Sequence, residues 1–336
     1  MSLLDHGGNL QAAIAGSTRA ASDWIDLSTG INPHGYPVPV VPADAWRRLP
    51  EPSDLLDAAA RAYYGAPALL AVAGTQAAIQ ALPHLIAPTR VVVSAPSYAE
   101  HASGWRRGGH AVREVSFDDL GTVLDACDVM VVCNPNNPTG ACIAPETLLR
   151  WAERLDRRGG WLVVDEAFCD TAQELSVAAY SGRPGLIVLR SIGKFFGLAG
   201  LRLGFVAAQP ALLSRLQDAL GPWCVSGPAQ QIGCTALRDT AWQQTTRKQL
   251  ARSGTRLRDL LATHAINASG TALFQWWWRP CAQAVAIQQH MASHGLWVRL
   301  FTGGAGGIRI GLPPDEPGWR RLADALATWD LVKEID

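Results

Sequence analysis

Five short apolar runs, each followed at once by a polar tip, dominate the first two thirds of this 336-residue sequence. They cover residues 69–73, 91–93, 129–133, 161–164 and 186–189. Continuous apolar runs of this length are typical of parallel strands buried on both faces, and the intervening stretches are long enough for crossover helices. The sequence therefore predicts an α/β fold with a large domain built on a mostly parallel sheet.

The length and the change of pattern along the chain predict more than one domain. A chain of 336 residues exceeds the usual size of a single core. After about Leu213 the strand-and-tip pattern stops, and mixed helix and strand patterns follow: helices at 230–237, 242–264, 283–294 and 318–332, and strands at 270–278, 296–301 and 307–312. We expect an N-terminal arm (1–30), a large domain (31–213) and a smaller α+β domain (214–336).

Composition excludes several classes of protein. Lys plus Arg equals Asp plus Glu at 29 each, so nothing directs the chain towards nucleic acid or an anionic membrane. The seven cysteines form no C-x-x-C, which favours free thiols in a reducing compartment over disulfides or a zinc site. No signal-peptide pattern and no apolar stretch near 18 residues is present. We expect a cytoplasmic protein.

The tips carry the candidate chemistry, because ligands collect at the carboxyl ends of parallel strands. Lys194 follows the run 186–189, among small and aromatic neighbours that can desolvate its amine and make it a nucleophile towards an aldehyde. Arg202 is a fixed cation suited to a phosphate. The turn Gly74-Thr75-Gln76 precedes an alanine-rich helix, so its amides would face a phosphate. The alternatives are a structural lysine and an ordinary helix cap.

Three further tip residues suit an aromatic ligand. Asp165 follows three apolar residues, and a buried carboxylate needs a cation such as a protonated pyridine nitrogen. Asn137 either donates a hydrogen bond to a ring oxygen or is a turn residue. Tyr98 either stacks on a ring or packs in the core.

The motifs together resemble a known family. Ser191-Ile-Gly-Lys194, followed by Arg202, is similar to the Schiff-base lysine motif of fold-type I pyridoxal-phosphate enzymes. Gly-Thr-Gln, Asn-Pro-Asn-Asn-Pro-Thr-Gly, Asp-Glu-Ala-Phe, Ser-Ile-Gly-Lys and Gly-Ile-Arg appear in the order of class I and II aminotransferases. The resemblance implies a cofactor site of Lys194 (the Schiff base), Asp165 (pyridine nitrogen), Asn137 (ring oxygen), Tyr98 (stacking), and Gly74, Thr75, Gln76, Ser191 and Arg202 (the phosphate turn and its partners).

The arm refines this expectation. By the residues alone, His6-Gly7-Gly-Asn9 and Asn32-Pro33 are turns. They also resemble the opening of the threonine-phosphate decarboxylases of cobalamin synthesis, relatives of histidinol-phosphate aminotransferase. That resemblance implies decarboxylation of L-threonine O-3-phosphate by a homodimer, with a substrate site of His6, Gly7, Asn32, Arg299 and Arg309. The alternative is histidinol-phosphate or related amino-acid transamination.

Two positions depart from the family pattern. Phe168 stands where many aminotransferases have a tyrosine that contacts the ring oxygen, and Leu49 stands where relatives have a tyrosine that reaches the neighbouring subunit. His290 and His294 have the spacing of a zinc pair, but no Glu follows the first, so we expect no metal. A cofactor-binding regulator is the alternative from another class, and the short arm without a basic winged-helix segment makes an enzyme the expectation.

Overall fold

The computed structural model describes residues 6–302 and 306–333, which form two compact units. The large unit comprises Gly35–Asn137 and Ala141–Thr246. The small unit comprises Met1–His34, Pro138–Gly140 and Arg247–Asp336. The described part of the expected arm therefore clusters with the C-terminal residues.

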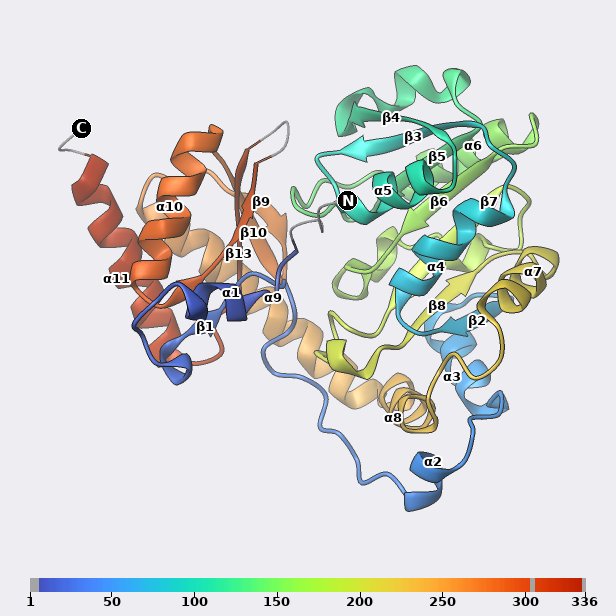
Figure 1. The fold of residues 1–336 in the computed structure, drawn as a ribbon, viewed down its shortest axis with the longest axis horizontal. Coiled ribbons are helices and arrows are strands. Elements are labelled where there is room, and N and C mark those ends of the chain that lie inside the picture. Colours follow the sequence, from blue (N-terminus) through green and yellow to red (C-terminus); the bar gives the residue numbers. More distant parts are fainter. Residues whose placement is uncertain (1–5, 303–305, 334–336) are drawn as a thin grey trace. The chain divides into compact units, whose positions relative to one another are not determined.

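A seven-stranded sheet forms the centre of the large unit (Figure 1). Its strands, in spatial order, are β2 (Leu69–Val72), β8 (Gly204–Ala207), β7 (Leu186–Ser191), β6 (Trp161–Asp165), β5 (Val129–Cys133), β3 (Arg90–Ala95) and β4 (Ala111–Ser116). β8 runs antiparallel to both of its neighbours, and the remaining pairs are parallel. The predicted α/β fold with a mostly parallel sheet is confirmed, and all five predicted strands are present.

Helices cover this sheet and bury its apolar side chains. They are α3 (Asp54–Tyr64), α4 (Thr75–Ala81), α5 (Ala99–Arg107), α6 (Pro145–Asp156) and α7 (Pro210–Leu220). α8 (Gly227–Arg238) packs on α3, and α2 (Ala43–Arg47), which has no buried residue, packs on α8. Ile79, Trp105 and Leu212 from three of these helices pack with strand residues such as Val131 in one buried cluster. α3 begins after Ser53, whose Oγ accepts a hydrogen bond from the Leu56 amide.

The small unit combines short strands with longer helices. β1 (Ile25–Asp26) pairs in parallel with β11 (Leu296–Trp297). An antiparallel sheet has the order β12 (Arg299–Phe301), β13 (Gly307–Gly311), β10 (Phe274–Trp278) and β9 (Ser269–Thr271). The helices are α1 (Leu10–Ala15), α10 (Cys281–Ser293), α11 (Glu316–Lys333) and the C-terminal part of α9 (Thr240–Thr263), which begins in the large unit.

The sequence predicts too few strands in the small unit. The single strand expected at 270–278 is two strands that pair antiparallel with each other around a tight turn. The strand expected at 296–301 divides because Leu296 pairs with β1 whereas Arg299 pairs with β13.

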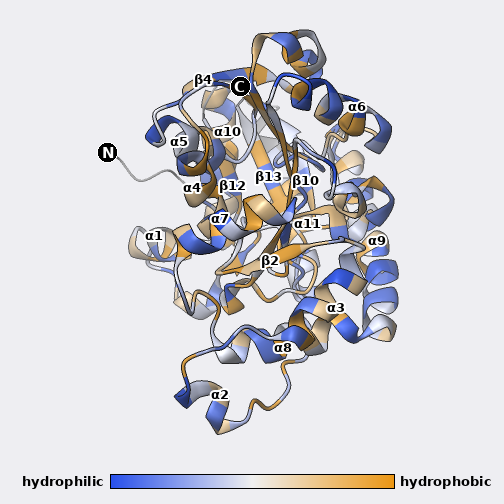
Figure 2. Cartoon of the chain, turned by 90° about the vertical axis from the view of Figure 1, so that its right-hand side faces the viewer, coloured by the Kyte–Doolittle hydropathy of each residue, from blue (hydrophilic) through white to orange (hydrophobic). Residues whose placement is uncertain are grey.

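Hydropathy follows this architecture. Figure 2 shows hydrophobic colour along β2, β10 and β13 and hydrophilic colour on much of α6 and α9. Within residues 6–302 and 306–333, no helix combines the length and the apolar character that crossing a membrane requires.

Candidate active site

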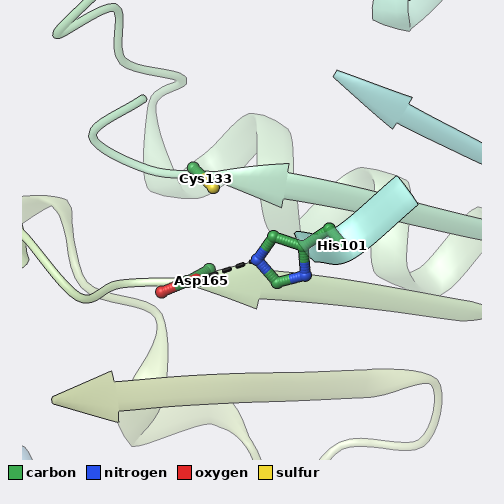
Figure 3. Close-up of side chains that lie close together, drawn as sticks. All are labelled: His101, Cys133 and Asp165. Atoms are coloured by element: carbon green, nitrogen blue, oxygen red, sulfur yellow. Dashed lines mark hydrogen bonds and ion pairs between the residues drawn. The ribbon is translucent and has the colours of Figure 1, made fainter. Parts of the chain in front are cut away.

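A buried histidine and a buried aspartate meet at the end of the central strands (Figure 3). Asp165 ends β6, and its Oδ2 lies 2.8 Å from Nε2 of His101 on α5. The parallel register pairs Asp165 with Cys133, the last residue of β5, so both side chains lie on the same face of the sheet. Sequence reasoning missed His101. The only signal was a polar residue on an otherwise apolar helix face three positions after Tyr98.

The environment of His101 fixes its protonation state. Burial by itself would lower the pKa of His101, but hydrogen bonds to Asp165 and Cys133 outweigh this and raise that pKa to about 10. His101 is therefore protonated at neutral pH and donates a charge-assisted hydrogen bond to Asp165. The other carboxylate oxygen, Oδ1, accepts a hydrogen bond from the Ala167 amide at 3.0 Å. Asp165 is thus held in one orientation.

The same cluster contains groups that bind metals. The ligand atoms of His101, Cys133 and Asp165 lie within 4.8 Å of one another, and all three residue types ligate zinc. These ligand atoms already form hydrogen bonds within the protein. His101 bonds to Asp165, and Ser97 Oγ donates to the Cys133 Sγ at 3.2 Å. The arrangement is a hydrogen-bonded network that orients Asp165.

Tyr98 and Gln76 join this network. The Tyr98 ring meets His101 edge to face at 5.9 Å, and its hydroxyl donates to Gln76 Oε1 at 3.1 Å. Gln76 Nε2 in turn donates to Glu100 at 2.7 Å. Burial, with nearby Glu100 and Asp165, raises the pKa of Tyr98 to about 12, so the phenol stays protonated. The structure therefore brings together three residues predicted from separate tips, namely Gln76, Tyr98 and Asp165.

The predicted phosphate residues gather around Gly204 on β8. Ser191 is paired with Gly204 across the β7–β8 ladder. A Cβ on Gly204 would lie 2.8 Å from the Thr75 amide nitrogen, so only glycine permits this approach. Gly74 has φ +72°, and a Cβ there would lie 2.6 Å from a guanidinium nitrogen of Arg202. The Arg202 guanidinium and the Thr75 amide thus lie close to Gly74 and Gly204, and Ser191 stands next to Gly204 in the sheet.

Lys194 lies in the loop after β7. Its Nζ is 5.3 Å from the centre of the buried Phe168 ring. The two residues that follow, Phe195 and Phe196, pack against Trp242, and the Tyr36 amide donates to the Phe196 carbonyl at 2.8 Å. The sequence contains three lysines, at 194, 248 and 333, and Lys194 is the single lysine of the large unit.

Asn137 is half-buried in the loop after β5. The preceding Asn136 donates from Nδ2 to the Pro96 carbonyl at 2.9 Å, and Asn134 bonds twice to the backbone of Ile143. The Asn136 hydrogen bond fastens the loop after β5 to the loop after β3, and the Asn134 hydrogen bonds close the β5 loop on itself. The role of Asn137 as a ring-oxygen donor stays a prediction.

In the small unit, two predicted substrate residues form an adjacent pair of cations. Arg309 on β13 is 4% exposed and stands opposite Arg299 on β12 in the antiparallel register. Burial, with repulsion from Arg299, lowers the pKa of Arg309 to about 9, and Asp26 opposes this change. Two neighbouring guanidinium groups, one of them buried, favour an anionic ligand.

Ser28 connects residues of the arm to the Arg299–Arg309 pair. Arg309 donates a hydrogen bond to the Ser28 carbonyl, and the Gly8 amide donates to Ser28 Oγ at 2.8 Å. A Cβ on Gly7 would lie 2.4 Å from the Ser28 oxygen, so this approach requires glycine. Asn32 is buried, with its Oδ1 accepting from the His34 amide, and His6 is exposed. The structure thus joins Gly7, Arg299 and Arg309 through Ser28, and the substrate roles of His6 and Asn32 stay predictions.

Comparison with known proteins identifies the family. Residues 23–326 match the family model for aminotransferase class I and II. The chain belongs to this family. Family members depend on pyridoxal phosphate. This agrees with a lysine at a strand end, a buried carboxylate, and a cation and an amide that can bind a phosphate.

Two relatives of the class I and II family match over nearly their whole length. A threonine-phosphate decarboxylase from Pseudomonas aeruginosa is 49% identical over 96% of this chain and 97% of its own. One from a Sinorhizobium species is 42% identical over 97% of this chain and 98% of its own. The crystal structure of L-threonine-O-3-phosphate decarboxylase from Porphyromonas gingivalis has the same fold, with a TM-score of 0.76 at 21% identity, covering 90% of this chain and 98% of that one.

The His101–Asp165 pair makes the stability depend on pH. Because the pKa of His101 rises from 6.5 to about 10 on folding, its contribution is fully present below pH 6.5 and is lost as the pH rises through about 10. Replacing His101 with Asn should remove on the order of 2 kcal/mol of stability at pH 6.5 and abolish this loss on alkalinisation. Urea unfolding of the cofactor-free protein across this range measures it, with the exposed His84→Asn as control. Parallel pH profiles for wild type and His101→Asn would contradict the assignment.

Proposed function

We propose that this chain is a pyridoxal-phosphate-dependent decarboxylase that converts L-threonine O-3-phosphate to (R)-1-amino-2-propanol O-2-phosphate in cobalamin biosynthesis. The observation that carries the proposal is the likeness to threonine-phosphate decarboxylases over nearly the full length of both chains. The arrangement of the strand-end residues supports it.

The residues of the large unit fit the cofactor. The missing Cβ of Gly74 lets the Arg202 guanidinium approach the start of α4, and a cation next to helix amides suits a phosphate. Thr75 begins that helix, and Ser191 pairs with Gly204 in the adjoining ladder. Lys194 is the lysine of the large unit, and the Phe168 ring stands beside it. When bound, pyridoxal phosphate supplies an electron sink that stabilises negative charge at Cα of an amino acid.

Each residue then has a specific task. Lys194 would hold the cofactor through its amine and, once released, would carry the proton to Cα. Asp165, oriented by His101, would pair with the pyridine nitrogen and keep it protonated. Asn137 would donate to the ring oxygen, and Tyr98, held by Gln76, would stack on the ring.

The arginines of the small unit select the substrate. L-Threonine O-3-phosphate carries two anionic groups, a carboxylate and a phosphate. Arg299 and Arg309 offer two adjacent guanidinium groups that suit such anions, and His6, Gly7 and Asn32 are assigned to the phosphate with Arg299. Holding both anions would fix the orientation of the substrate, and that orientation would decide which bond to Cα is broken.

Phe168 is compatible with decarboxylation, and the alternative is histidinol-phosphate or related amino-acid transamination. It is buried with its ring 5.3 Å from the Lys194 Nζ, at the position where many aminotransferases carry a tyrosine. A phenyl ring cannot donate the hydrogen bond that a tyrosine gives to the ring oxygen. The cofactor ring, which acts as the electron sink, would therefore lack a hydrogen bond that it has in those aminotransferases.

Two incubations separate the two activities. With pyridoxal phosphate and L-threonine O-3-phosphate, the protein should release carbon dioxide in a one-to-one ratio with amino-propanol phosphate. With histidinol phosphate and 2-oxoglutarate, it should form no glutamate. Unphosphorylated L-threonine is the control, and it should react far more slowly because it lacks the second anion. Transamination of histidinol phosphate without carbon dioxide release from the threonine ester would overturn the proposal.

We further propose that the chain forms a homodimer through the segment around α2. Large apolar side chains between residues 38 and 55 are 59 to 98% exposed in the single chain: Val38, Val40, Trp46, Leu49 and Leu55. A concentration of this kind marks an interaction surface.

Light scattering tests the homodimer. The purified protein should have twice the chain mass at micromolar concentration, and Trp46→Asp combined with Val40→Asp should shift it towards the monomer, because each charge would be buried in the interface. A monomeric wild-type protein under these conditions would contradict the assignment.

A further inference from the structure

A buried cluster of charges lies at the ends of β6 and β7, apart from the residues assigned to the cofactor. Arg190 is 1% exposed, and Glu166 and Asp170 are fully buried. One guanidinium nitrogen of Arg190 lies 2.5 Å from Glu166 Oε2, and the other lies 2.5 Å from Asp170 Oδ1. Ser176 Oγ and the Val177 amide also donate to Glu166, at 2.5 and 2.7 Å. The Arg190 guanidinium rests 4.5 Å from the centre of the Tyr64 ring.

The cluster lies on the face of the sheet opposite the candidate active site. Asp165 pairs with Leu189, and the next residues, Glu166 and Arg190, point to the other face because strand side chains alternate. The ladder continues there, since the Glu166 amide donates to the Leu189 carbonyl at 2.9 Å. Each of these two charged residues is also a chain neighbour of a residue assigned to the cofactor. Arg190 immediately precedes Ser191, and Glu166 immediately follows Asp165.

The cluster also holds the turn that presents Phe168. Glu166 and Asp170 stand two residues before and two residues after Phe168, and both bond to Arg190. The Cys169 amide closes the turn on the Glu166 carbonyl at 3.0 Å. One guanidinium group thus clamps both ends of the turn whose ring stands beside Lys194.

Stability alone is a poor reason for such a cluster. Removing three charged groups from water is costly, and apolar residues of similar volume in place of a buried ion triad are often neutral or stabilising. What an apolar core lacks is the planar fork of arginine, which binds two carboxylates in fixed directions. The feature that distinguishes the cluster is therefore the geometry that it imposes on the strand ends.

We propose that Arg190 is a positioning residue that locks the Asp165 tip and the Phe168 turn to the strand leading into Ser191 and Lys194, so that the cofactor site is assembled before the cofactor binds. The inference rests on the proposed function, since it takes these residues as the cofactor's partners. Arg190 itself touches neither cofactor nor substrate in this account.

Variants of the cluster test this proposal through cofactor binding. Arg190→Lys keeps the charge but has no fork to bridge two carboxylates. The triple variant Arg190→Met, Glu166→Gln, Asp170→Asn removes all three charges, so no carboxylate is left buried without a partner. Arg154→Met is the matched control, because Arg154 pairs with Asp125 in an exposed ion pair on α6 of the same unit. The measurements are pyridoxal-phosphate affinity by visible absorbance, the pH dependence of that absorbance, and thermal unfolding of the cofactor-free protein.

We expect both cluster variants to fold and to bind pyridoxal phosphate more weakly, with a Kd raised on the order of tenfold, as when a supporting residue behind a ligand is lost. The midpoint of the absorbance–pH profile should move in both, because Phe168 and Asp165 shift relative to Lys194. Arg154→Met should match wild type in both measurements.

Two other results would contradict the proposal, and they are distinguishable. If the cluster variants unfold at a lower temperature but keep the wild-type Kd and pH profile, Arg190 is only structural, and the proposed function stands. If the wild-type protein itself binds no pyridoxal phosphate, the proposed function fails, and this inference fails with it.

Discussion

The parallel register of β5, β6 and β7 is the constraint on which the chemistry of the large unit depends. It aligns Cys133, Asp165 and Leu189 in one row, so the loops that follow these strands begin at the same edge. Each loop then places a different chemical group there. The antiparallel β8 completes the arrangement, because its pairing sets Gly204 opposite Ser191 and so allows Gly74, Thr75 and Arg202 to approach.

Buried charge is used twice at this edge, once on each face of the sheet. On one face His101 donates to Asp165, which orients a carboxylate towards the candidate cofactor site. On the other face Arg190 binds Glu166 and Asp170. Both arrangements are costly to bury and are compensated by close, charge-assisted hydrogen bonds. Such bonds define geometry more sharply than apolar contacts, which is what a site with several independent loops requires.

The sequence predicts the elements whose signal is local. Apolar runs bounded by turn residues reveal five strands of the large sheet, and Ser53 marks the start of α3. β4 is missed because it is an exposed edge strand with little apolar character. β8 is missed because its four residues lie inside a glycine-rich tract. Both depend on pairing with distant partners, which periodicity along the chain does not record.

The same distinction applies to the candidate site. Residues at strand tips, such as Asp165 and Lys194, are predictable because position in the fold follows from the strand pattern. His101 and Arg190 are not, since their roles come from contacts across 64 and 24 positions of sequence. The choice between decarboxylation and transamination depends on the orientation of one bond relative to a ring, a matter of a fraction of an ångström that residue types do not encode.

The most direct test of the account is to find which lysine bonds to pyridoxal phosphate. Borohydride reduction of the protein with its cofactor converts the carbon–nitrogen double bond to a stable amine, and peptide mapping by mass spectrometry then locates the label. The account predicts the label on Lys194 alone, in the peptide that follows β7. A label on Lys248 or Lys333, or no label after saturation with the cofactor, would contradict it.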